Sequence, residues 1–234
     1  MTRTRLSVSL LDLGIIAPGQ NGASILEQTL RLAQLADRLG YERLWLSEHH
    51  EAHFAWTGPE VVLATLAQAT RRIGLGSAAV LLPLYSPLAV AEAYRTLSAL
   101  SGNRIALGVC AGVPADPVAL AALMENEMDA GNASRQLADK LAALVRYLDG
   151  DFPAGHRFAN GATPCFAERP ALWLMGVGRA QRRDGGGRRR RLCLFAVPPR
   201  EHAGPGDRQR LPRPRPAGRG RAVADCAELR LRRH

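Results

Sequence analysis

The sequence has no long apolar run and few cysteines. The 234-residue chain has no uninterrupted apolar stretch of about 18 residues, the length that a membrane-spanning helix needs. Its four cysteines are scattered without a Cys-x-x-Cys pair, which argues against a zinc knuckle or a disulfide framework. The first residues lead into a strand pattern and lack the apolar core of a secretory signal. We therefore expect a cytoplasmic protein with no membrane partner and no metal.

Lysine is nearly absent, and positive charge is unevenly distributed. The chain has one lysine, Lys140, and a net charge of +10. Residues 179–234 contain 17 arginines and five acids, whereas residues 1–178 contain 14 basic and 16 acidic side chains. A near-neutral body is therefore joined to a strongly basic tail, which predicts a globular domain over 1–178 and a different segment over 179–234.

The tail is rich in arginine, proline and glycine and contains a single aromatic residue, Phe195. Such a segment buries too little apolar surface to offset its ordering entropy, so irregular structure is predicted. Its charge would suit nucleic acid, but it lacks the aromatics that stack on bases, and we expect no nucleic-acid partner. A shift of reading frame near residue 179 is a further hypothesis, because codons for residues 191–195 read one base later permit an apolar strand.

In the body, strand periodicity alternates with helix periodicity. Strands are predicted over residues 6–12, 43–47, 73–82, 104–110 and 171–176. Helices are predicted from capping boxes beginning at Ser24 and Thr57, from Ser86-Pro87, and over residues 134–148. This alternation predicts right-handed βαβ units and a parallel sheet of the α/β class. It fits about five βα units of an incomplete TIM-type (β/α)8 barrel, and equally a doubly wound sheet.

An incomplete barrel has a structural consequence. Its first and fifth strands would each have an edge with unpaired backbone groups, beside apolar surface suited to further strands. We therefore expect two open edges.

In parallel α/β folds, ligands bind at the carboxyl ends of strands. These ends supply Asp12, Ser47-Glu48-His49-His50, Ala78-Ala79, Cys110 and Gly176-Val177-Gly178. The last segment lacks the third glycine of a dinucleotide fingerprint. The residues alone leave the cluster of His49, His50 and His53 open to three readings: metal binding, an exposed cluster, or proton handling. Cys110 is open to two, a small buried hydrophobe or a reactive thiol.

Three motifs on successive strands resemble those of the luciferase-like flavin-dependent monooxygenases. Residues 45–50 (WLSEHH) resemble that family's W-L-x-E-H-H strand end. Residues 76–83 (GSAAVLLP) resemble its G-x-A-A-x-x-L-P strand, and residues 104–112 (RIALGVCAG) resemble its R-F-x-F-G-x-C-R-G strand. The motifs occur in the family's order, and the resemblance covers residues 1–178.

The resemblance implies binding of reduced FMN (FMNH2), activation of O2 as a flavin C4a-peroxide, and oxygenation of a small organic substrate. No nicotinamide site is recognisable, which implies a separate flavin reductase as partner. A homodimer is implied through the second and third helices, since the segment 57–69 is apolar on more than one side. Two alternatives remain: a deazaflavin-dependent oxidoreductase on the same scaffold, and a truncated, non-catalytic flavin-binding protein.

By matching position, His49 and Cys110 are the predicted catalytic residues, with His49 handling protons beside the flavin. Cofactor contacts are predicted for Asp12, Glu48, Ala78, Ala79, Cys110 and Gly178. The Ala78–Ala79 bond would be a non-proline cis peptide beneath the flavin ring. One position departs from the pattern: Ala111 stands where the family has an arginine that holds the flavin phosphate, so a bidentate cation is missing.

Overall fold

The computed structural model describes residues 7–124, 130–150, 152–153, 155–158, 168–179 and 190–197. The strands are β1 (Ser9–Asp12), β2 (Arg43–Leu46), β3 (Gly74–Leu81), β4 (Ile105–Cys110), β5 (Ala171–Arg179) and β6 (Arg190–Val197). The helices are α1 (Gly22–Leu39), α2 (Pro59–Ala69), α3 (Pro87–Ser101), α4 (Pro117–Leu123) and α5 (Ala130–Asp149), with a 3-10 turn η1 (Leu82–Leu84). No helix in these ranges is long and apolar enough to cross a membrane.

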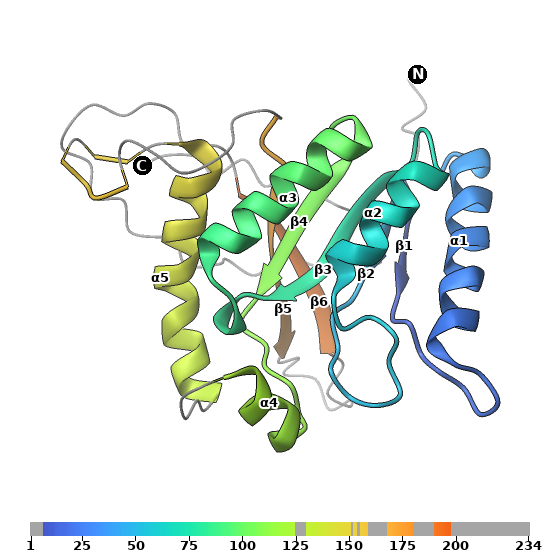
Figure 1. Cartoon of the computed structure of the whole chain (residues 1–234), viewed down its shortest axis with the longest axis horizontal. Coiled ribbons are helices and arrows are strands. Elements are labelled where there is room, and N and C mark those ends of the chain that lie inside the picture. The colour runs from blue at the N-terminus through green and yellow to red at the C-terminus, as the bar shows by residue number, and fades with distance from the viewer. Residues whose placement is uncertain are drawn as a thin grey trace, which may run out of the picture.

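The sheet is wound in one direction. Strands β1 to β5 are parallel neighbours in chain order. Helices α1, α2, α3 and α5 lie side by side across the same face of the sheet (Figure 1). A doubly wound sheet carries helices on both faces, whereas a barrel carries them only on the outside. The structure therefore confirms the α/β class and follows the barrel alternative.

Three predicted helix starts differ from the structure by one to four residues, and one of them is that of α5, which begins at Ala130 and not at residue 134. Helix α1 is capped by Asn21, whose side chain accepts a hydrogen bond from the Ser24 N–H at 2.9 Å. The Asn21 N–H in turn donates to the Ser24 hydroxyl at 3.1 Å, so Ser24 is the third helical residue and not the cap. Helix α2 is capped by Gly58 with Pro59 in its first turn, and no side chain caps it. Helix α4 was not predicted at all.

The two expected open edges have different outcomes. Within the described part of the chain β1 pairs only with β2. Leu11 in β1 and Ile15 just after it are 47% and 54% exposed, as expected of an open edge. The edge of β5 is covered by β6, which runs antiparallel to it. Residues 190–197 thus form a strand inside the tail predicted to be irregular, because the run Leu-Cys-Leu-Phe-Ala-Val favours extended structure. The rest of that tail lies outside the described residues.

Side chains of the sheet alternate between two apolar clusters. The larger cluster packs the sheet against the helices, and its fully buried members include Leu44, Leu46, Leu75, Leu107 and Leu172. The smaller cluster lies on the opposite face, which becomes the interior of a closed barrel. It consists of Trp45, Ala79, Ala106 and Met175, with Ala78, Cys110 and Trp173 packed against them.

Candidate functional site

A break in the β3–β4 ladder marks the centre of the candidate site. The Ala78–Ala79 peptide is cis, as the resemblance implied, and the pairing register shifts between Ser77 and Val80. The buried Ser77 hydroxyl bridges the break, because it donates to the Gly108 carbonyl and accepts from the Gly108 N–H, each at 3.1 Å. Small side chains therefore line the sheet where β3 and β4 reach their carboxyl ends.

Large rings support this small-residue surface. Trp45 and Trp173 meet edge to face, with ring centroids 5.8 Å apart. Met175 lies against Gly108 so closely that a Cβ on Gly108 would be 2.5 Å from the Met175 Cε. Both indole Nε1 atoms are buried and have no hydrogen-bond partner within the described ranges. The interior next to Cys110 is thus an apolar wall that contains two indole N–H donors without acceptors in the described part of the chain.

The carboxylate of Glu48 is the most buried charged group of the site, with 1% of its side chain exposed. One oxygen, Oε1, accepts from the Tyr85 hydroxyl at 2.6 Å and lies 2.9 Å from the His50 Nε2. The other oxygen accepts from the Leu81 N–H at 3.0 Å. Burial raises the pKa of Glu48, and these three hydrogen bonds partly offset the rise. The carboxylate therefore joins the ends of β2 and β3.

His49 lies beside this network and is more open to solvent. Its ring stacks on Phe54 with centroids 4.1 Å apart, and its Nδ1 lies 3.7 Å from a Glu51 carboxylate oxygen. Partial burial lowers the pKa of His49, and the charge of Glu51 only partly offsets this. At neutral pH the ring is consequently biased toward the neutral form, which can accept a proton.

Cys110 ends β4 and pairs in register with Leu81 of β3. Its half-buried sulfur accepts a hydrogen bond from the Gly112 N–H at 3.4 Å. Burial raises the pKa of the thiol, and the nearby charge of Glu48 raises it further. The sulfur is therefore a thiol at neutral pH and not a pre-formed thiolate.

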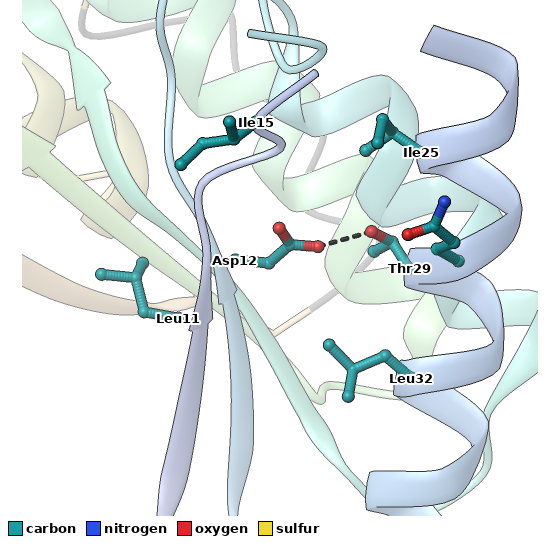
Figure 2. A pocket seen from close by; sticks show the side chains of 7 residues that line it. Leu11, Asp12, Ile15, Ile25, Thr29 and Leu32 are labelled. Atoms are coloured by element: carbon teal, nitrogen blue, oxygen red, sulfur yellow. Dashed lines mark hydrogen bonds between the residues drawn. The ribbon is translucent and has the colours of Figure 1, made fainter. Parts of the chain in front are cut away.

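Asp12 is separate from these residues. Its carboxylate faces α1, where it accepts hydrogen bonds from the Gly14 N–H at 2.8 Å and from the Thr29 hydroxyl (Figure 2). It lines a groove of about 370 Å³ between the open edge of β1 and α1. The groove is lined by Leu11, Asp12, Ile15, Ile25, Gln28, Thr29 and Leu32. In this position Asp12 anchors the helix to the sheet.

Of the predicted site residues, the structure brings together Glu48, His49, Ala78, Ala79 and Cys110 at the ends of β2, β3 and β4. Gly178 lies near the end of β5, where its backbone pairs with Arg191. Tyr85 and His50 were missed as functional partners of Glu48. His50 was visible in the W-L-x-E-H-H motif, whereas no sequence signal joins Tyr85 to a residue 37 positions away. No group of three or more potential metal ligands occurs among the residues that the structure describes.

A parallel sheet wound in one direction, with functional groups gathered at the strand ends, defines the class of (β/α)-barrel enzymes. Residues 11–206 match the family described as luciferase-like monooxygenase, and the chain belongs to this family. The match extends past residue 178, and the predicted domain boundary there stays a prediction.

The relatives that this chain resembles are about twice as long as the matched region. The N-acetyl-S-alkylcysteine monooxygenase of Bacillus subtilis (strain 168) is 37% identical over 173 residues, which are 73% of this chain and 51% of the relative. The crystal structure of apo-MsnO8 is 39% identical with a TM-score of 0.64, and the match covers 74% of this chain and 50% of that chain. The chain thus spans about half the length of the curated relatives it matches.

More distant structures share the fold alone. One is the oxygenating constituent of 3,6-diketocamphane monooxygenase from Pseudomonas putida in complex with FMN, 20% identical, with a TM-score of 0.58 over 71% of this chain and 50% of that one. Another is the coenzyme F420 dependent tetrahydromethanopterin reductase from Methanopyrus kandleri, which is 19% identical. Its TM-score is 0.51, and the match covers 74% of this chain and 51% of that one.

Proposed function

We propose that the protein is an FMNH2-dependent monooxygenase that oxygenates a small organic substrate. The observation that carries this proposal is that His49 follows β2 and Cys110 ends β4, the two strands that flank β3 with its cis Ala78–Ala79 peptide. The names of the relatives support the reaction class. The absence of a nicotinamide fingerprint from the sequence supports a separate reductase as the source of reduced flavin.

The described residues fit the flavin ring better than they fit its phosphate. The small side chains of Ala78 and Ala79 leave room for a flat ring, and the rings of Trp45 and Trp173 close the interior behind them. Phosphate binding is less well supported, because Ala111 offers no charge at the end of β4. We therefore expect FMN to bind, with its ring contributing more of the affinity than its phosphate.

Reduced FMN would supply two electrons, so that one oxygen atom of O2 enters the substrate and the other leaves as water. The residues of this chain would act around that chemistry. Neutral His49 accepts a proton at its ring and returns it, and the apolar wall excludes water from the reacting atoms. Cys110, as a neutral thiol, would contact the edge of the ring without adding charge.

Binding and turnover test the proposal separately. FMN fluorescence titration measures binding, and oxygen transfer from isotopically labelled O2 to a panel of small thioethers and ketones measures turnover with chemically reduced FMN. We expect saturable binding and incorporation of label into one product. His49→Ala should lower turnover about 100-fold or more, the scale of general acid–base catalysis, with little change in FMN affinity. Binding without any incorporation of label would favour the non-catalytic alternative.

A deazaflavin-dependent reaction is the second candidate, and the fold of the F420-dependent reductase supports it. That cofactor transfers hydride and does not activate O2, so the two candidates differ in what they consume. A competition titration with FMN and coenzyme F420 distinguishes them, because tighter binding of F420 with no oxygen uptake would replace our proposal.

A homodimer through α2 and α3 remains part of the proposal, although α2 exposes less apolar surface than the sequence predicts. Two of the apolar residues of α2, Leu66 and Ala67, are buried in the core, whereas Val61 is 69% exposed. Dimerisation would bury Val61, and sedimentation at tens of micromolar tests it, since Val61→Asp should shift a dimer toward monomer. A monomer in both proteins would remove the dimer from the proposal.

A further inference from the structure

We propose that His50 is a second proton-accepting group of the site, held in one tautomer by Glu48, and that Tyr85 is the positioning residue that fixes Glu48. This inference rests on the proposed function, but its geometric part is testable in the protein without flavin. It assigns the buried carboxylate to orienting a histidine and not to contacting the cofactor, the role that the resemblance suggested.

Glu48 is held from two sides by donors, since an ionised carboxylate can only accept. The Leu81 backbone N–H can only donate, and it fixes Oε2 at 3.0 Å. The Tyr85 hydroxyl donates to Oε1 at 2.6 Å. Burial raises the pKa of Tyr85, and the charge of Glu48 raises it further, so the phenol keeps its proton and stays a donor. The carboxylate is therefore locked by groups from β3 and from the turn after η1.

This arrangement decides which nitrogen of His50 carries the proton. When Glu48 is ionised it only accepts hydrogen bonds, and the His50 Nε2 lies 2.9 Å from Oε1, so Nε2 then carries a hydrogen. Nδ1 is then left with its lone pair, and no hydrogen bond to it occurs among the described residues. When Nδ1 accepts a proton, the ring becomes cationic beside Glu48, which offsets its charge. The same proton leaves from Nδ1 to restore the neutral ring.

His50 and His49 differ in how firmly they are held. The His49 side chain is 37% exposed, and its nearest carboxylate oxygen, from Glu51, is 3.7 Å from Nδ1, which is too long for a hydrogen bond. The His50 side chain is 10% exposed and is hydrogen-bonded at 2.9 Å. Solvent can therefore influence the tautomer of His49, whereas Glu48 sets that of His50.

Other titratable groups surround the network without bonding to His50. Glu60 of α2 interacts electrostatically with Tyr85, the fully buried Tyr94 of α3 interacts with Tyr85 and with Glu48, and Cys110 of β4 interacts with Glu48. Glu60 thus provides a matched control: it carries the same charge as Glu48 and lies near Tyr85, but it holds no ring in place.

Glu48→Gln is the decisive variant because it keeps the shape and reverses the two hydrogen bonds at Oε1, those from Tyr85 and from His50, and the Tyr85 hydroxyl can turn to accept. The Leu81 N–H requires an acceptor, so the amide oxygen must take the place of Oε2. The amide NH2 then takes the place of Oε1 and faces the His50 Nε2 as a donor. Nε2 must become an acceptor, which moves the ring proton to Nδ1 and removes the free lone pair.

The experiment reads the His50 tautomer from two-bond 1H–15N spectra of the full chain labelled with 15N-histidine, with His50→Gln to assign the signals. We expect the Nε2–H tautomer in the wild type and in Glu60→Gln, and the Nδ1–H tautomer in Glu48→Gln. With reduced FMN, turnover should fall about 100-fold in Glu48→Gln, the lower end of acid–base effects. It should fall about 10-fold in Tyr85→Phe, the scale of one lost hydrogen bond, while FMN affinity stays unchanged in both.

Different experimental results would overturn the geometric part of this inference and its catalytic part. An Nδ1–H tautomer in the wild type would overturn the inference directly, and that spectrum needs no variant to fold and no flavin to bind. Wild-type turnover in Glu48→Gln, despite a changed tautomer, would remove His50 from the reaction. Loss of FMN binding in the wild type would instead count against the proposed function and leave the tautomer result standing.

Discussion

The Trp45 ring occupies the space that a side chain on Gly76, its partner in the β2–β3 ladder, would need. A Cβ at Gly76 would lie 2.6 Å from the Trp45 Cζ3 and 2.9 Å from the Ala106 carbonyl oxygen. The glycine that opens the G-x-A-A motif is thus required by the ring behind the site. This one contact therefore links the sequence motif to the packing of the interior behind the candidate site.

Gly76→Ala should destabilise the fold by about 1–3 kcal/mol, because neither the backbone carbonyl nor the packed ring can move freely. Urea unfolding monitored by tryptophan fluorescence measures the change. Gly22→Ala is the matched control, since a Cβ there meets no atom within 4 Å. Equal stability of the two variants would mean that the interior adapts and that Gly76 is not constrained by packing.

Restoring the missing cation should strengthen cofactor binding. Ala111→Arg places a guanidinium at the end of β4, and we expect FMN to bind about 10-fold tighter, the scale of one charge-assisted hydrogen bond. Riboflavin, which has the same ring and no phosphate, should show no gain, and Ala115→Arg serves as a charge control. Equal gains for FMN and riboflavin would place the effect elsewhere than the phosphate.

Cys110 should react slowly at neutral pH because burial raises the pKa of its thiol. The thiolate is the reactive form, so alkylation by iodoacetamide should accelerate as the pH rises toward that pKa and beyond. Peptide mass spectrometry follows Cys110 separately from the other cysteines. Rapid, pH-independent labelling at pH 7 would show a pre-formed thiolate and contradict this assignment.

Asp37 should make the stability of the fold depend on acid pH. Its carboxylate accepts from the N–H groups of Arg71, Arg72 and Ile73 at 3.0, 2.8 and 2.6 Å. Burial opposes ionisation, but these bonds outweigh it and lower the pKa of Asp37. The stabilisation is therefore present above the unfolded-state value of about 4 and lost as the pH falls through the lower folded-state pKa.

Asp37→Asn should accordingly cost about 1–3 kcal/mol at pH 7, where the wild type holds a charged acceptor. The difference between the two proteins should shrink below pH of about 4, as the wild-type carboxyl is protonated. Urea unfolding of the two proteins at several pH values measures the stability difference and its dependence on pH. A difference that is constant from pH 7 to pH 3 would show that the charge of Asp37 does not contribute.

The basic segment 179–234 leads to a prediction at the level of DNA. We propose a reading-frame shift near residue 179, supported by the change of composition there. A gene corrected by one base should encode an apolar strand after β5, and its product should be more soluble and bind FMN more tightly. Coding DNA whose alternative frames offer no such strand would contradict the proposal.

Local sequence was sufficient for the order of elements in the body. Sequence patterns located strands β1 to β5 and four of the five described helices within a few residues, since burial on one face imposes its repeat on the chain. Start signals were less reliable, because Asn21 and Ser24 are both good caps and only the path of the backbone shows which one is used. Helix α4 has seven residues, none of them buried, so it left no apolar stripe to find.

Sequence alone also determined the family and the strand ends that carry Glu48, His49 and Cys110, because these residues lie within contiguous motifs. The tertiary structure decided what each of them does. It turned Asp12 toward Thr29 of α1, and it buried Glu48 between Tyr85 and Leu81, contacts made across 17 to 37 positions of sequence. A motif fixes residue types along a strand, whereas the orientation of a carboxylate depends on which distant donors the fold brings within hydrogen-bonding distance.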